Sequence, residues 1–175
     1  MALSADKVVV AVTGKVYVGA TTATAPTSAI STLTSFTELG YVSTDGVEFA
    51  TDKSSNQIRA WQNADLVREV VTEGTVTYKF TLIETSQAVV ELYFGGTMVA
   101  GKIQLNPTST GGRKSFVIDV VDGAKAIRHY IPSGEIFSIE AQKFVNGDSV
   151  AYGFTVTAFA TSGRSADVYF SEFAV

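Results

Sequence analysis

The chain has 175 residues, of which 46% are hydrophobic and 17% charged, with no cysteine and a formal net charge of −4. It is too apolar for intrinsic disorder, and the absence of cysteine excludes disulfides and thiolate metal sites. Its negative charge, with no cluster of Lys and Arg, argues against tight nucleic-acid binding.

The length suits one unit, and we expect residues 1–175 to form a single domain. Charge is scarce for a soluble monomer, which indicates surface buried against other subunits. The longest aliphatic run, residues 8–12, is far shorter than the ~20 residues of a membrane helix, and no signal-peptide pattern opens the chain. We therefore expect a soluble protein with no membrane contact that is not exported by the general route.

Short alternating runs of Val, Thr, Tyr and Phe, separated by Gly, Asp, Asn and Ser, predict a mainly β fold. In chain order the expected strands are residues 7–12, 15–18, 47–51, 57–61, 64–73, 76–82, 115–121, 126–131, 135–145, 149–159 and 166–173. Turn dipeptides that favour positive φ lie at Asp45-Gly46, Asp122-Gly123, Ser133-Gly134, Asn146-Gly147 and Ser162-Gly163. Asn146-Gly147, between two long runs, gives the strongest hairpin signal.

One short helix is expected at about residues 85–94, packed on the outside of a sheet. Thr85 or Ser86 is placed to cap it, an apolar stripe runs along it, and Gly95-Gly96 follows it. The stripe consists of Ala88, Val89, Leu92 and Tyr93. The segment 64–73 also fits a helical stripe, but its β-branched residues favour a strand.

Two stretches have the composition of long loops. Residues 21–35 are rich in Thr, Ala and Ser, and residues 106–114 contain Pro107 and two glycines. Loops of this length in a compact domain are usually either functional or mobile. Because Ile30, Leu33 and Phe36 are spaced to dock on a surface, we expect the first loop to be mobile in the monomer and to order against an adjacent subunit.

No constellation of residues indicates catalysis, a cofactor or a metal. The single histidine, His129, cannot form a metal site alone and is interpreted as a strand residue on a polar face. The acid pairs Glu69 with Glu73 and Asp119 with Asp122 could be compared with the two carboxylates of a glycosidase. A chain with 17 acidic residues contains such pairs by chance, so they do not indicate this activity. We expect no catalytic residue and no enzyme activity.

Most aromatic side chains alternate into apolar faces and are expected in the core. Trp61 differs because polar residues surround it near a predicted strand end. Two roles stay open for Trp61, an anchor between subunits, which we prefer, or a core residue.

Several stretches between residues 13 and 85 have a recognisable order and spacing. They read TGKVYVG at 13–19, LGYVSTDGV at 39–47, IRAWQ at 58–62, VR at 67–68, TE at 72–73 and FTLIET at 80–85. Together they resemble the major tail tube proteins of siphovirus-type, long-tailed bacteriophages, over about half of the chain. These motifs are structural and not catalytic.

The resemblance implies a β-sandwich or open barrel with one helix outside, assembled as a homohexameric ring. In that family the rings stack into the tail tube, neighbouring sheets join into a continuous barrel around a lumen, and a long loop reaches the next ring. DNA passes through without specific binding. The implied partners are the tape measure, tail terminator and distal tail proteins, and the implied location is the virion tail, with assembly in the host cytoplasm.

Four acids are candidates for the lumen. Glu69 and Glu73 share one side of the strand 67–73, and Glu48 and Asp52 alternate together on the run 46–52. A weakly negative lumen would repel the phosphate backbone. The alternative is that these acids are ordinary solvated or interface charges.

Other functions stay open. A tail terminator, a connector or the inner tube of a contractile injection device would have much the same sequence pattern. A monomeric β-sandwich that binds sugar or protein would instead expose a compact aromatic patch. An enzyme is the least supported function.

Overall fold

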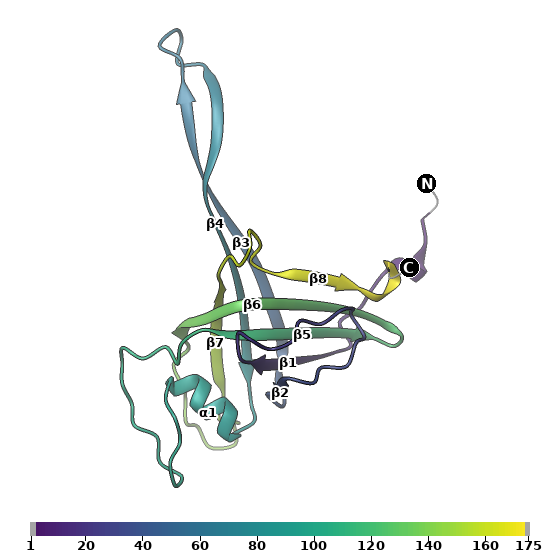
Figure 1. Cartoon of the computed structure of the whole chain (residues 1–175), viewed down its shortest axis with the longest axis vertical. Coiled ribbons are helices and arrows are strands. Elements are labelled where there is room, and N and C mark those ends of the chain that lie inside the picture. Colours follow the sequence, from purple (N-terminus) through teal and green to yellow (C-terminus); the bar gives the residue numbers. More distant parts are fainter. Residues whose placement is uncertain (1–2, 174–175) are drawn as a thin grey trace.

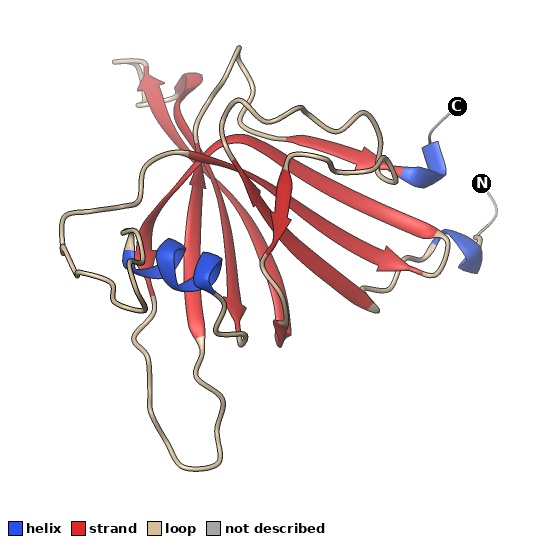
Figure 2. Cartoon of the chain, turned by 60° about the horizontal axis from the view of Figure 1, so that its bottom comes forward, coloured by secondary structure: helices blue, strands red, loops and turns tan. Residues whose placement is uncertain are grey.

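A computed structural model of the chain describes residues 3–173, which are mainly β with one α-helix (Figures 1 and 2). The strands are β1 (Thr13–Gly19), β2 (Phe36–Glu38), β3 (Val42–Arg59), β4 (Leu66–Leu82), β5 (Lys114–Asp122), β6 (Lys125–Ile139), β7 (Tyr152–Ala158) and β8 (Asp167–Phe170). The helix is α1 (Gln87–Phe94), and two 3-10 turns are η1 (Ala5–Lys7) and η2 (Ser171–Phe173). The mainly β fold class predicted from the alternating runs is confirmed.

One antiparallel sheet contains all the strands, in the order β2-β1-β5-β6-β7-β4-β3, with β8 paired to β6. β6 belongs to both halves of this sheet, because residues 126–131 pair with β5 and residues 134–139 pair with β7. Between them β6 continues through Ser133 and Gly134, where the sequence predicts a turn instead, and Gly134 pairs with both Lys114 of β5 and Ala158 of β7. Side chains of the two halves meet in one core.

The core takes its largest side chains from the alternating run of β4. Tyr78, Phe80 and Leu82 are fully buried, as the pattern at 76–82 predicts. They pack in one core cluster with Phe154 and Val156 of the neighbouring strand β7 and with buried residues of β1, β5 and β6, namely Val16, Phe116, Ile118 and Ile131. Each such side chain stabilises the fold by about 1.5–3 kcal/mol relative to exposure.

α1 follows the sequence prediction closely. The Ser86 hydroxyl accepts a hydrogen bond from the Val89 amide, and Gly95 ends the helix at φ 63°, a left-handed conformation that suits glycine. Tyr93 packs edge-on against Tyr152 and Phe154. The helix is thereby fixed against β7.

β3 and β4 are far longer than the sequence predicts. Residues 47–51 and 57–59 of two predicted runs belong to β3, and residues 66–73 and 76–82 of the next two belong to β4. The choice of strand over helix for 64–73 is confirmed for residues 66–73, whereas residues 64 and 65 lie in the turn before β4. The join in β3 was missed because residues 52–56 are polar and exposed on both faces, so no apolar alternation marks them.

The predicted strand at 7–12 is wrong. Residues 5–7 form a 3-10 turn, and residues 8–12 have no strand partner. β1 begins opposite Val121, one residue before β5 ends at Asp122, so no neighbouring backbone extends alongside the valines. The Val10 amide instead donates to the Asp122 carboxylate at 2.9 Å.

The predicted tight hairpin at Asn146-Gly147 is a longer loop. β6 ends at Ile139 and β7 begins at Tyr152, so residues 140–151 project from the sheet (Figure 2). β4 pairs with β7 only as far as Tyr152. Beyond that point the two strands would form an isolated ribbon, which is marginally stable. The loop expected at 106–114 likewise belongs to a longer connection between α1 and β5.

Candidate assembly surfaces

The outer halves of β3 and β4 form a two-stranded arm, residues 51–75, that projects from the body (Figure 1). Every residue of the arm except the partly buried Ala60 is exposed. At its tip the Ala60 amide donates to the Asp65 carbonyl at 2.8 Å, and Asn63 and Ala64 have positive φ. A lone hairpin gains little stability from burial, so this arm is suited to pack against another chain.

Apolar side chains lie along the arm without cover. Trp61, at the tip, is 98% exposed, which excludes the core role for it within this chain. Other large exposed apolar residues of the arm are Ile58, Leu66, Val67, Val70 and Val71. Exposed apolar surface of this kind is typical of interaction sites. The role of Trp61 as an anchor between subunits stays a prediction.

Three of the four candidate lumen acids share one face of the β3–β4 ribbon. Glu48 lies opposite Lys79, Asp52 opposite Thr75, and Glu73 opposite Ser54. Direct cross-strand partners point to the same side, and positions 48, 52 and 54 of β3 alternate together. Glu48, Asp52 and Glu73 therefore lie on the same face.

Glu69 lies on the opposite face, contrary to the sequence prediction. A bulge leaves Thr72 without a partner, since Ser54 pairs with Glu73 and Ser55 with Val71. The extra residue shifts the alternation between Glu73 and Glu69. Glu69 accepts hydrogen bonds from the Ser55 hydroxyl at 2.5 Å and the Gln57 amide at 3.5 Å, and these lower its pKa.

The same polar face continues across β4, β7 and the second half of β6. Lys79 lies opposite Thr155, and Thr77 opposite Thr157, which in turn lies opposite Glu135. Lys79 forms an ion pair with Glu140 at 2.7 Å. We call this four-stranded surface the polar face. Its reverse side carries the core residues Phe80, Phe154 and Val156.

Both lateral edges of this four-stranded half are unpaired among residues 3–173. β3 pairs only with β4, and residues 135–139 of β6 pair only with β7. Unpaired edges present rows of amide and carbonyl groups to which another chain's strand can bond. The half is therefore open to extension on both sides.

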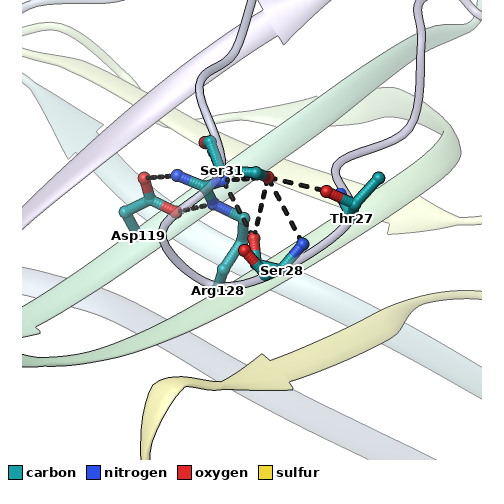
Figure 3. Close-up of polar contacts among 5 residues, drawn as sticks. All are labelled: Thr27, Ser28, Ser31, Asp119 and Arg128. Atoms are coloured by element: carbon teal, nitrogen blue, oxygen red, sulfur yellow. Dashed lines mark hydrogen bonds and ion pairs between the residues drawn. The ribbon is translucent and has the colours of Figure 1, made fainter. Parts of the chain in front are cut away.

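The loop 21–35 is docked on this chain's own sheet (Figure 3). The guanidinium of Arg128, on β6, pairs with the carboxylate of Asp119, on β5, through two contacts of 2.6 and 2.7 Å. Its Nη1 also donates to the carbonyls of Ser28 at 3.1 Å and Ser31 at 2.7 Å. Pro26 and Ala29 are buried beneath the same turn.

The sequence contains one signal for this pair, which we did not predict. Asp119 lies three residues before Asp122 and Arg128 three after Lys125, so a hairpin centred on the predicted Asp122-Gly123 turn places them opposite each other. The three loop residues singled out from the sequence differ in exposure. Ile30 is 73% exposed, Leu33 is half-buried, and Phe36 lies in β2 with its ring edge-on to Tyr130. Their contacts with other subunits stay predictions.

A family model described as "Phage tail tube protein" matches residues 1–172. This chain belongs to the phage tail tube protein family. It is a structural component of the phage tail, as the resemblance in sequence predicts. A search of curated proteins finds no match.

Solved structures similar to this tail tube family member include chains of an extracellular contractile injection system. A chain of the extracellular system PVC, in its sheath/tube terminator in the extended state, matches with a TM-score of 0.50 at 8% identity, covering 94% of this chain and 99% of that chain. A chain of the PVC sheath-tube complex gives 0.49 at 9%, covering 95% and 98%. The cap of the anti-feeding prophage tube gives 0.48 at 10%, covering 98% and 100%. The first likeness supports the fold of the tail tube family.

The groups considered for catalysis have structural roles in this tail tube family member. His129 lies on β6, but its Nδ1 is 3.0 Å from the Tyr78 hydroxyl and its ring contacts Tyr78 and Phe49, so it is not on a polar face. Burial lowers the pKa of His129. Asp119 is held by Arg128, and Asp122 accepts from Val10.

Two further features of this tail tube family member concern metal ions and membranes. Within residues 3–173 no three His, Asp or Glu side chains are grouped to hold a metal ion. No helix in that part of the chain has the length and hydropathy needed to cross a membrane.

Proposed function

We propose that this chain assembles into hexameric rings that stack into the tail tube, the conduit through which phage DNA enters the host. The observation that carries the proposal is the four-stranded half of the sheet, with a polar face on one side, the core on the other and an unpaired strand at each edge. A ring needs one surface that joins to a different surface of the next copy, and the two edges are such a pair.

In the proposed ring, β3 of one copy pairs with the second half of β6 of the next. This pairing continues the sheet from copy to copy and leaves no edge exposed. The sheet then closes on itself around a lumen, with the apolar side of each copy still covered by its own core. The scarcity of surface charge supports burial of this kind.

The polar face lines the proposed lumen. It carries the carboxylates of Glu48, Asp52 and Glu73, whereas its cation Lys79 is already paired with Glu140. A surface with a weak excess of negative charge repels the phosphate backbone, so DNA slides without binding. Tight DNA binding would instead require a row of unpaired Lys or Arg.

The proposed partners are the proteins that fill and end such a tube. A tape measure protein would occupy the lumen before DNA does, and terminator and distal tail proteins would meet the two ends of the stack. Assembly would take place in the host cytoplasm before the tail joins the virion. Membership of the tail tube family supports these partners. A stack of rings also leaves one uncovered ring surface at each end, where another protein can bind.

A second candidate is a ring that ends a tube, or the inner tube of a contractile device. The likeness to a chain of the PVC sheath/tube terminator covers nearly the whole of both chains and motivates this candidate. It uses the same fold and the same edge pairing. The two candidates differ in length of the assembly, because a terminator stops at a ring and a tube protein continues.

Size-exclusion chromatography followed by negative-stain imaging of the purified chain tests the proposal. We expect concentration-dependent growth into long tubes without a sheath, built of rings with sixfold symmetry. Single rings that never stack would favour the terminator. A monodisperse monomer at every concentration, salt and time would leave only the monomeric binding module.

A further inference from the structure

A groove lies at the opposite end of the molecule from the arm tip. It is formed where α1 meets the ends of β1 and β2, and its volume is about 530 Å³. Figure 1 shows α1 below the sheet and the arm above it. The tip and the groove therefore lie at opposite ends of the same chain.

The groove has an apolar wall, a glycine-rich part and a charged rim. Val18, Ala88 and Leu92 supply the wall, four glycines line another part, and Glu91, Arg113 and Lys114 are the charged lining residues. The glycines are Gly19, Gly95, Gly96 and Gly111. A volume of this size is typical of sites that enclose a ligand larger than a single aliphatic side chain. Trp61 is a group of the right kind, since its large flat ring is almost fully exposed at the arm tip.

Charge also matches between the two ends. The Asp65 carboxylate, next to the tip, forms no hydrogen bond or ion pair with any residue of the described range 3–173. Lys114 lines the groove and forms no ion pair within that range, whereas its neighbour Arg113 is held by Glu135 and stacks over Phe159. Glu91 also lines the groove, but its carboxylate already accepts hydrogen bonds from the Gln87 side chain and the Met98 amide. The tip thus offers a carboxylate without a partner in the described part of the chain, and the groove offers the Lys114 ammonium.

We propose that Trp61 of one copy inserts into this groove of a second copy, with Asp65 beside Lys114. The inference rests on the proposed function and deepens it by assigning the surface that the arm contacts. Because tip and groove are different surfaces at opposite ends, the contact is heterologous, and every copy retains one free tip or groove for the next. Such a contact repeats without limit, as stacking of rings requires.

The chain has no cysteine, so an introduced pair reports this contact cleanly. The test variant carries Gln62→Cys, beside Trp61, and Thr97→Cys, at the groove. The control carries Gln62→Cys and Thr32→Cys, an exposed threonine outside the groove. A disulfide forms only where Cα atoms come within about 7 Å. Oxidised tubes of the test variant should give a ladder of covalent oligomers on a non-reducing gel, and those of the control should not.

Trp61→Ala supplies the second measurement. It should keep the thermal unfolding temperature of the monomer and raise the concentration needed for tubes by about tenfold or more. Three results would contradict insertion of Trp61 into the groove without contradicting the tube function. They are tubes of the test variant that give no ladder, an equal ladder from the control, and normal tubes from Trp61→Ala. Failure of the unmodified chain to form tubes at all would overturn both.

Discussion

The Arg128 guanidinium and the Asp119 carboxylate form a bidentate pair between β6 and β5, and both residues are more than nine-tenths buried. The same guanidinium holds two carbonyls of the loop 21–35. A planar group with several fixed donors is suited to serve both partners at once. The pair thus links the position of a surface loop to the interior of the sheet.

Arg128→Met should destabilise the fold strongly. It leaves the buried Asp119 carboxylate without its partner, and breaking a buried pair in this way costs about 3–5 kcal/mol. Chemical denaturation measures the change in the free energy of unfolding. Lys15→Met, which breaks the exposed pair with Glu38 on the same half of the sheet, is the matched control and should have a far smaller effect. Equal effects of the two variants would contradict the assigned role.

Arg128→Lys should release the loop more than it destabilises the sheet. A lysine keeps a positive charge beside Asp119, but its single ammonium cannot reach both the carboxylate and two carbonyls in the same geometry. Hydrogen exchange should therefore speed up at the amides of residues 26–31. Unchanged exchange there would show that Arg128 does not hold the loop.

Ile30→Asp should impair assembly without unfolding the monomer. Ile30 is exposed at the turn that Arg128 holds, so the charge is tolerated in the free chain and penalised where the side chain is buried by a neighbour. We expect the concentration needed for tubes to rise by about tenfold or more. Thr32→Asp, also exposed in the same loop, is the control. Normal tubes from Ile30→Asp would exclude Ile30 as an inter-subunit contact.

Stability should fall as the pH drops below about 6.5 because of His129. Burial lowers the pKa of His129 in the folded state, so the unfolded chain binds its proton first as the pH falls. The free energy of unfolding therefore decreases from that pH down through the folded pKa, and it is independent of His129 at higher pH. His129 is the only histidine, so His129→Gln should reduce the pH dependence of the free energy of unfolding just below pH ~6.5. If that pH dependence is unchanged in the variant, it comes from carboxylates and not from His129.

The two faces of the β3–β4 ribbon give opposite expectations for DNA passage. Lysine at Glu48 or Asp52, on the polar face, should leave tubes intact but slow or trap DNA ejection, because a cation in the lumen holds phosphates. Lysine at Glu69, on the opposite face, should not slow ejection. Ejection kinetics from virions that carry each variant separate the two. If lysine at Glu48, Asp52, Glu69 and Glu73 leaves the ejection rate unchanged in every case, none of these acids faces the lumen.

Local signals in the sequence predicted those elements that depend on local chemistry. The limits of α1 follow from the Ser86 cap and the left-handed Gly95, and the core face of β4 follows from strict alternation. The arm was not predicted, because alternation appears only where one face is buried and the arm buries neither. The face predicted for Glu69 was wrong. The bulge at Thr72 depends on how β4 pairs with β3, and the sequence of β4 alone does not indicate that pairing.

The docked loop had no signal of its own. Residues 21–35 have the composition of a mobile segment, and their order comes from a side chain about 100 residues away, since Arg128 binds the Ser28 and Ser31 carbonyls. A deletion within 23–32 therefore removes a partner of Arg128 as well as an exposed surface. Single substitutions at Ile30 separate these two effects.

A reconstruction of the tube by cryo-electron microscopy would show directly how the copies join. We expect β3 of each copy to be hydrogen-bonded to residues 135–139 of β6 in the next copy, with Glu48, Asp52 and Thr155 facing the lumen. A ring in which those two edges stay apart, or in which the polar face points outward, would contradict this arrangement.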